Sequence, residues 1–185
     1  MAKTPSNNML SLGTDAPEFT LLDVISGHKL SLKKLKGTDA TVIMFICNHC
    51  PYVKHVNKEL TRLANDYLSP KVGFIAINSN DIAAYPDDSP ENMKKTAQVE
   101  NYPFPYLFDE TQEVAKAYKA ACTPDFYLFD AELKLVYHGQ LDDSRPGNAF
   151  PPNGDSIRQA LDCLLSQQPI DVQQKPSLGC NIKWK

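Results

Sequence analysis

Residues 41–53 read TVIMFICNHCPYV. The first six, residues 41–46, form an apolar run of strand length that is rich in β-branched side chains, as expected for a central strand buried on both faces. The run leads directly into Cys47 and Cys50, and Pro51 then suits the first position of a helix. From Pro51 on, apolar residues recur at steps of three and four, which predicts an amphipathic helix. The segment thus predicts a strand, a cysteine-bearing turn and a helix in succession.

The rest of the chain continues this alternation of strands and helices. Short runs at residues 19–22 and 29–32, joined through Ser26 and Gly27, predict a hairpin before the main sheet. Residues 140–154 are rich in Asp, Pro, Gly and Asn and predict a long surface loop. The remaining predicted elements are strands at 72–77, 104–108, 125–130 and 133–138, and helices opened by Ser89, carrying Val114 and carrying Ile157. The pattern predicts an α/β fold.

The length of 185 residues suits one compact domain with a sizeable core. We expect a flexible N-terminal tail at residues 1–12, a folded domain at 13–166 and a C-terminal tail at 167–185 that packs on the domain. The N-terminal tail is polar and has few apolar anchors, whereas the C-terminal tail becomes apolar near Trp184.

Charge and hydropathy exclude several classes of partner. The net charge of −3 is spread over the chain and gives no basic stripe for a nucleic acid. The polar start lacks the apolar core of a secretory signal, and no run approaches the ~20 apolar residues that span a bilayer. We therefore expect a cytoplasmic protein with no membrane partner, in which the five cysteines are thiols, catalytic groups or metal ligands rather than structural disulfides.

Several of these segments together resemble the thioredoxin-like superfamily, and within it the peroxiredoxin-like branch of alkyl hydroperoxide reductase, thiol-specific antioxidant and redoxin proteins. The shared segments are residues 14–19 (TDAPEF), the Cys-bearing turn, and Thr123-Pro124 before an apolar strand. The stretches CNHCPYV, CTPD and GCNIKW resemble an uncharacterised subgroup of that branch. The resemblance implies a thioredoxin-like fold with a central mixed β-sheet flanked by helices and an N-terminal β-hairpin. It also implies that Pro124 is a cis-proline beside the redox cysteine, with the backbone of Thr123 facing an incoming sulfur.

Two observations favour Cys50 over Cys47 as the nucleophile. Cys50 directly precedes Pro51 and so occupies the N-cap, where its sulfur can accept from the amide of Tyr52 or Val53 and where the helix dipole stabilises a thiolate. In thioredoxins the nucleophile is the fifth residue after the strand's aromatic, and counting from Phe45 this is Cys50. The opposite assignment stays open, with Cys47 attacking, Cys50 resolving and His49 stabilising the thiolate.

The sequence departs from the resembling family at two positions. The threonine that peroxiredoxins carry three residues before the peroxidatic cysteine is replaced by Cys47, and Val53 stands where thioredoxins carry their second cysteine. Of the three arginines, none is at an obviously matching position. The resemblance therefore implies weak or absent peroxide activation. Cys47, three residues from Cys50, would lie close enough to resolve an oxidised Cys50 by forming a disulfide with it.

Three further residues have two interpretations each. His49 is an electrostatic partner of the thiolate or an exposed turn residue. Cys122 is a buried apolar side chain or a third redox partner, because it lies two residues before Pro124. Cys180 is a resolving thiol, as in two-cysteine peroxiredoxins, or part of a packed tail. Thr123 and Pro124 are auxiliary site residues through the resemblance alone.

These observations predict a thiol-disulfide oxidoreductase or peroxiredoxin-like antioxidant with Cys50 and Cys47 as its CxxC redox pair. Its substrate would be a protein disulfide or a hydroperoxide, and its reductant thioredoxin or a glutathione-type thiol. We assign no metal ligand, and the absence of a Gly-rich dinucleotide loop predicts no organic cofactor. The alternatives are a thioredoxin-fold protein that binds zinc or copper, and a non-catalytic interaction module. A homodimer is left open.

Overall fold

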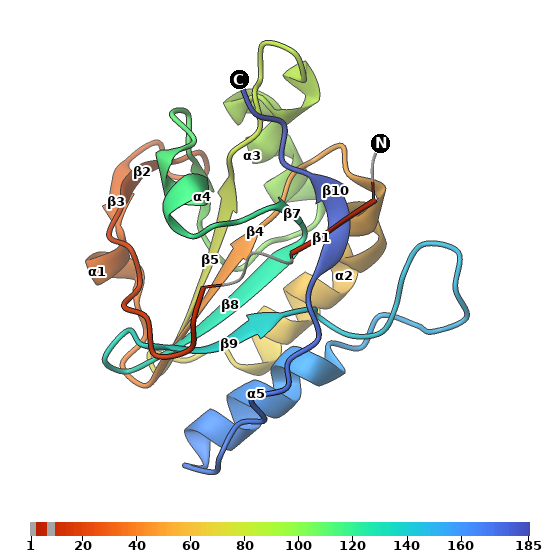
Figure 1. The fold of residues 1–185 in the computed structure, drawn as a ribbon. Coiled ribbons are helices and arrows are strands. Elements are labelled where there is room, and N and C mark those ends of the chain that lie inside the picture. Colours follow the sequence, from red (N-terminus) through yellow and green to blue (C-terminus); the bar gives the residue numbers. More distant parts are fainter. Residues whose placement is uncertain (1–2, 7–9) are drawn as a thin grey trace.

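The computed structural model of the chain describes residues 3–6 and 10–185. Its centre is a twisted sheet with helices on both faces (Figure 1). From edge to edge the strands are β3 (Lys29–Ser31), β2 (Thr20–Asp23), β6 (Tyr106–Phe108), β5 (Val72–Asn78), β4 (Ala40–Phe45), β8 (Asp125–Asp130) and β9 (Leu135–Gly139). The three strands β4, β5 and β6 are parallel to one another, and the outer strands pair antiparallel. The predicted mixed sheet and N-terminal hairpin, which is β2 and β3, are thus confirmed.

Strand β4 is the centre of the core because both of its faces are covered. All six of its residues are buried, and alternate side chains enter different clusters. Met44 packs in the cluster that contains residues of α2 (Pro51–Asp66), α3 (Pro90–Val99) and α5 (Asp155–Leu165). Phe45 packs in the opposite cluster, with residues of α1 (Leu32–Leu35) and α4 (Glu113–Ala117). The continuous apolar run of the sequence is the direct result of this double burial.

The predicted starts of two helices are confirmed at their N-caps. Cys50 is the N-cap of α2 and Pro51 its first residue, and the Ser89 hydroxyl accepts from the amide of Asn92 at the start of α3. A short 3-10 helix, η1 (Pro86–Asp88), precedes α3. Between β9 and α5 the chain forms the predicted loop without a helix or strand. Within the described ranges no helix has the length and apolarity needed to cross a bilayer.

A second, three-stranded sheet joins segments that are far apart in the sequence. Its order is β1 (Lys3–Pro5), β10 (Leu178–Asn181) and β7 (Cys122–Thr123), with both pairs antiparallel. Figure 1 shows β10 crossing beside the main sheet near the start of α2.

The pairing of β1 differs from the flexible tail expected at residues 1–12. Lys3–Pro5 is held by backbone hydrogen bonding to β10 and not by apolar side chains, so hydropathy gives no sign of it. Residues 1–2 and 7–9 of that expected tail lie outside the described residues. The division at residues 13–166 and 167–185 stays a prediction.

Candidate functional site

The two cysteines of the CxxC segment lie at the junction of β4 and α2. Cys50 has an extended backbone at the N-cap, and both side chains are buried, with Cys50 fully enclosed and Cys47 2% exposed. The Cys50 thiol makes no capping hydrogen bond in this conformation, so the predicted bond from the amide of Tyr52 or Val53 is not formed. The Val53 amide nevertheless helps to lower the pKa of Cys50, because it lies close to the sulfur at the positive end of the helix.

The peptide bond between Thr123 and Pro124 is cis, as the resemblance implies. Thr123 contacts both thiols of the turn. Its hydroxyl lies 3.3 Å from the sulfur of Cys47, and its carbonyl oxygen accepts from the thiol of Cys50 at 3.3 Å. One residue therefore holds the two sulfur atoms against the loop that carries the cis-proline.

A third thiol, that of Cys180, completes a cluster of sulfur atoms. Its sulfur lies 2.8 Å from that of Cys50, although 129 residues separate the two in the chain. Strand β10 places it there, because Cys180 is paired with Thr123 in the antiparallel ladder of β10 and β7. No disulfide joins any of the cysteines in the described part of the chain, and all five are free thiols.

The three thiols have different acidities because the hydrogen bonds among them stabilise the thiolate of Cys50. The pKa of Cys50 is lowered to about 5, chiefly because the thiol of Cys47 donates to it, and the thiol of Cys180 and nearby amides add to this against the opposing cost of burial. The pKa of Cys47 is raised well above its ordinary value by that same donation, by burial and by the carboxylate of Asp88. Burial and the neighbouring Cys50 raise the pKa of Cys180 to about 12. Cys50 is thus the one thiol of the cluster poised as a thiolate near neutral pH.

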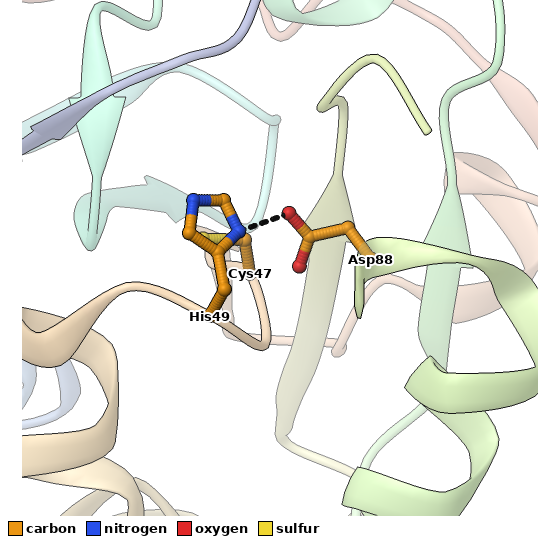
Figure 2. A group of neighbouring side chains, drawn as sticks. All are labelled: Cys47, His49 and Asp88. Atoms are coloured by element: carbon orange, nitrogen blue, oxygen red, sulfur yellow. Dashed lines mark hydrogen bonds and ion pairs between the residues drawn. The ribbon is translucent and has the colours of Figure 1, made fainter. Parts of the chain in front are cut away.

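His49 faces a buried carboxylate and not open solvent (Figure 2). Its Nδ1 lies 2.5 Å from Oδ2 of Asp88, and its ring stacks on Tyr85 with 5.2 Å between the ring centroids. The His49 side chain is 11% exposed and that of Asp88 is fully buried. The sulfur of Cys47, a ring nitrogen of His49 and a carboxylate oxygen of Asp88 all lie within 4.8 Å of one another, and these are atoms of metal-ligating type.

Asp88 is the functional candidate that sequence reasoning missed. It ends η1 inside a polar segment without periodicity, where nothing in the sequence distinguishes it from Asp87 or Asp81. The fold brings it to the turn through the amide of Asn48, which donates to its Oδ1, and the side chain of Asn80, which donates to its Oδ2, each at 2.7 Å.

Cys122 is fully buried, and its thiol lies 3.8 Å from the carbonyl oxygen of Pro124. Burial is the largest cause of its raised pKa, so the geometry favours the buried apolar interpretation over a third redox thiol. The three arginines are bonded to other groups of the protein: Arg62 and Arg158 to Glu59, and Arg145 to residues of its own loop.

Comparison with known proteins agrees with this arrangement. Residues 12–138 match the AhpC/TSA family. The chain belongs to this family. Membership supports a thiol-dependent redox enzyme in general terms. A search of curated proteins gave no match.

Solved structures include two proteins similar over nearly the whole chain. An uncharacterised conserved protein from Geobacillus kaustophilus is 64% identical with a TM-score of 0.97, covering 100% of this chain and 97% of its own. A hypothetical protein from Sinorhizobium meliloti 1021 is 44% identical with a TM-score of 0.93, covering 96% and 97%. The thioredoxin domain of a thiol-disulfide oxidoreductase from Bacteroides vulgatus is 18% identical with a TM-score of 0.62, covering 80% and 96%. This last likeness is one of fold and confirms the thioredoxin-like architecture.

Proposed function

We propose that this member of the AhpC/TSA family is a thiol-disulfide oxidoreductase or peroxiredoxin-like antioxidant in which Cys50 is the nucleophile. The observation that carries the proposal is the position of the Cys50 sulfur: it lies at the start of α2, within reach of Cys180 and beside the cis peptide bond before Pro124. Its lowered pKa, about 5, supports the same assignment, because the thiolate is the attacking species.

Two substrates suit this chemistry. With a disulfide, the Cys50 thiolate attacks one sulfur, forms a mixed disulfide and releases the other sulfur as a thiolate. With a hydroperoxide, it attacks the terminal oxygen, so that the O–O bond breaks, Cys50 becomes a sulfenic acid and the alkoxide leaves as an alcohol after taking a proton. The engagement of all three arginines in other bonds favours disulfide exchange, since no guanidinium is free to orient a peroxide in the described residues.

A second thiol of the cluster then closes an intramolecular disulfide. Attack by Cys47 on the mixed disulfide releases the substrate thiol, and attack on the sulfenic acid releases water. We propose Cys47 and Cys50 as this pair, since Cys47 already donates to Cys50. Cys180 is the second candidate for the same step, because its sulfur lies 2.8 Å from that of Cys50.

A dithiol of thioredoxin type, or two molecules of a glutathione-type monothiol, would then reduce the pair by two electrons and restore the starting state. Such a cycle fits a reducing compartment. The cytoplasmic location stays a prediction, and cell fractionation is its test.

Burial of the sulfur atoms restricts which substrates reach them. Since Cys50 has no exposed surface and Cys47 has only 2%, a small hydroperoxide or small disulfide has easier access than a folded protein. A protein disulfide would require β10 to move away from Thr123, because that strand occupies the backbone edge beside the cis-proline.

Mass spectrometry after limited treatment with a hydroperoxide or oxidised glutathione tests the proposal. Wild-type protein should form a mixed disulfide or sulfenic acid at Cys50 and then an intramolecular disulfide. Cys50→Ser should lose this oxidation, and Cys47→Ser should retain the first step and lose a Cys47–Cys50 product. Cys163→Ser is the matched control, since Cys163 lies on α5 outside the cluster. A wild-type Cys50 as unreactive as an ordinary thiol would instead favour the non-catalytic interaction module.

A further inference from the structure

A group of three different metal-ligating side chains lies beside the redox thiols. Cys47 and His49 lie in the turn between β4 and α2 and Asp88 ends η1, so two separate parts of the fold converge on one point (Figure 2). We propose that Cys47, His49 and Asp88 form a Zn²⁺ site. This inference goes beyond the proposed function, because metal binding requires no turnover.

The separation of the donor atoms suits a small tetrahedral ion. Zinc bonds of about 2.0–2.3 Å place neighbouring donors about 3.4–3.8 Å apart. The donors of this group all lie within 4.8 Å of one another. The 2.5 Å hydrogen bond between Nδ1 of His49 and Oδ2 of Asp88 has to lengthen by about 1 Å to admit the ion.

The chemistry of the donors favours zinc over calcium and magnesium. A thiolate, an imidazole and a carboxylate are all usual zinc ligands, whereas calcium and magnesium prefer oxygen alone. On binding, Cys47 gives up its thiol proton, and His49 binds the ion through an unprotonated ring nitrogen. Nδ1 is the nitrogen that faces Asp88, and the buried Nε2 has no hydrogen-bond partner among residues 3–6 and 10–185. Three protein ligands leave a fourth position for water or a small anion.

The charge around Asp88 also favours a cation. The carboxylate is fully buried, and the one ion pair it makes in the described residues is with His49. Two neutral hydrogen-bond donors and one imidazole face this buried carboxylate, and a divalent ion would offset its charge further. Neighbouring groups already hold the donors in place as an outer shell: the Asn48 amide and the Asn80 side chain bond to Asp88, and the Thr123 hydroxyl lies beside Cys47.

Zinc at this site would engage the thiol that the proposed function uses. A Cys47 thiolate bound to zinc is not free to close a disulfide with Cys50, so metal binding and the Cys47–Cys50 disulfide exclude each other. Cys180 would remain available to Cys50, because it approaches from β10 on a different part of the chain. The mutual exclusion of zinc and the disulfide rests on the proposed function, whereas the proposed zinc site itself does not.

The test is a zinc titration of the reduced, chelator-treated full-length protein in competition with a chromophoric chelator. Wild type should bind one zinc ion, and Cys47→Ser, His49→Ala and Asp88→Asn should each weaken binding by at least about tenfold. The matched controls Cys163→Ser, His28→Ala and Asp87→Asn replace the same residue types outside the group and should bind zinc as wild type does. Circular dichroism of each variant checks that it is folded.

Cobalt in place of zinc gives a readout that needs no variant, because a thiolate ligand produces a ligand-to-metal charge-transfer band. Wild-type protein should show this band and Cys47→Ser should lose it. Failure of wild type to bind either ion above the level of His49→Ala would overturn the proposal and leave a His–Asp hydrogen bond. Zinc retained by all three ligand variants but lost in Cys50→Ser or Cys180→Ser would overturn it too, by placing the metal on the other thiols. Neither result bears on whether Cys50 reacts with a disulfide, so the two proposals fail separately.

Discussion

Cys180 lies directly opposite Thr123 in the antiparallel pairing of β10 with β7, and its sulfur is 2.8 Å from that of Cys50. The protein's own C-terminal strand thus occupies the backbone edge next to the cis-proline. In this position β10 both supplies a thiol to the nucleophile and covers it, since Cys50 has no exposed surface.

Gly179 is the residue that allows β10 to approach so closely. A Cβ at this position would lie 1.9 Å from the carbonyl oxygen of Thr123, a separation that no side chain tolerates. We expect Gly179→Ala to push β10 off Thr123 and to make Cys50 react at least several-fold faster with a bulky disulfide reagent.

The measurement is the rate of thiol modification under native conditions, with Gly147→Ala as the control. A Cβ at Gly147 meets nothing within 4 Å, and because its φ is +89° its substitution strains the backbone of an exposed loop alone. An unchanged rate for folded Gly179→Ala would show that β10 does not limit access to Cys50.

The oxidised state should contain a disulfide to Cys50 whichever neighbouring thiol is removed. Cys47→Ser leaves Cys180 beside Cys50, and Cys180→Ser leaves Cys47. We expect both single variants to form an intramolecular disulfide after mild oxidation, and the double variant Cys47→Ser/Cys180→Ser to stop at sulfenic acid or mixed disulfide. Peptide mapping identifies the bonds. Loss of the disulfide in Cys47→Ser alone would exclude Cys180 as a resolving thiol.

The acidity of Cys50 predicts a specific pH dependence. Its pKa is lowered to about 5, so the thiolate forms as pH rises through about 5 and not through the ordinary range near 8.5. The ultraviolet absorbance of the thiolate, taken as wild type minus Cys50→Ser, should therefore rise between about pH 4 and 6. Cys47→Ala should move this rise to higher pH, because the thiol of Cys47 is the largest cause of the lowered pKa. A midpoint near 8.5 in wild type would contradict the assignment of Cys50 as nucleophile.

Local patterns predicted the part of this site that is contiguous in the chain. The apolar run of β4, the two cysteines and the proline at the start of α2 are neighbours in sequence, and each carries a strong local preference. Thr123 and Pro124 were predicted as site residues only from the family resemblance, because a Thr-Pro pair alone carries no sign of a cis bond.

What the sequence left open depends on long-range contacts. The sequence allows Cys180 to be a resolving thiol or part of a packed tail. Only the pairing of β10 with β7 places its sulfur beside that of Cys50. Asp88 had no local signal, since a buried carboxylate is recognised by the amides of Asn48 and Asn80 that bind it and not by its neighbours in the chain. The strand β1 was missed for a similar reason, because backbone pairing to β10 leaves no apolar pattern.

Phe45 links the core to the site and gives the last prediction. Its side chain is fully buried, with ring centroids 5.6 Å from Tyr118 and 5.7 Å from Tyr127, and it is the last residue of β4 before the turn that carries Cys47. Phe45→Ala should lower the free energy of unfolding by about 3–5 kcal/mol, because it removes a buried ring and leaves a cavity. Leu68 is 67% exposed, so Leu68→Ala should change the free energy of unfolding by no more than about 0.5 kcal/mol. Denaturant unfolding of both variants measures the difference, and a loss below about 1 kcal/mol for Phe45→Ala would mean that this aromatic cluster does not support β4 as described.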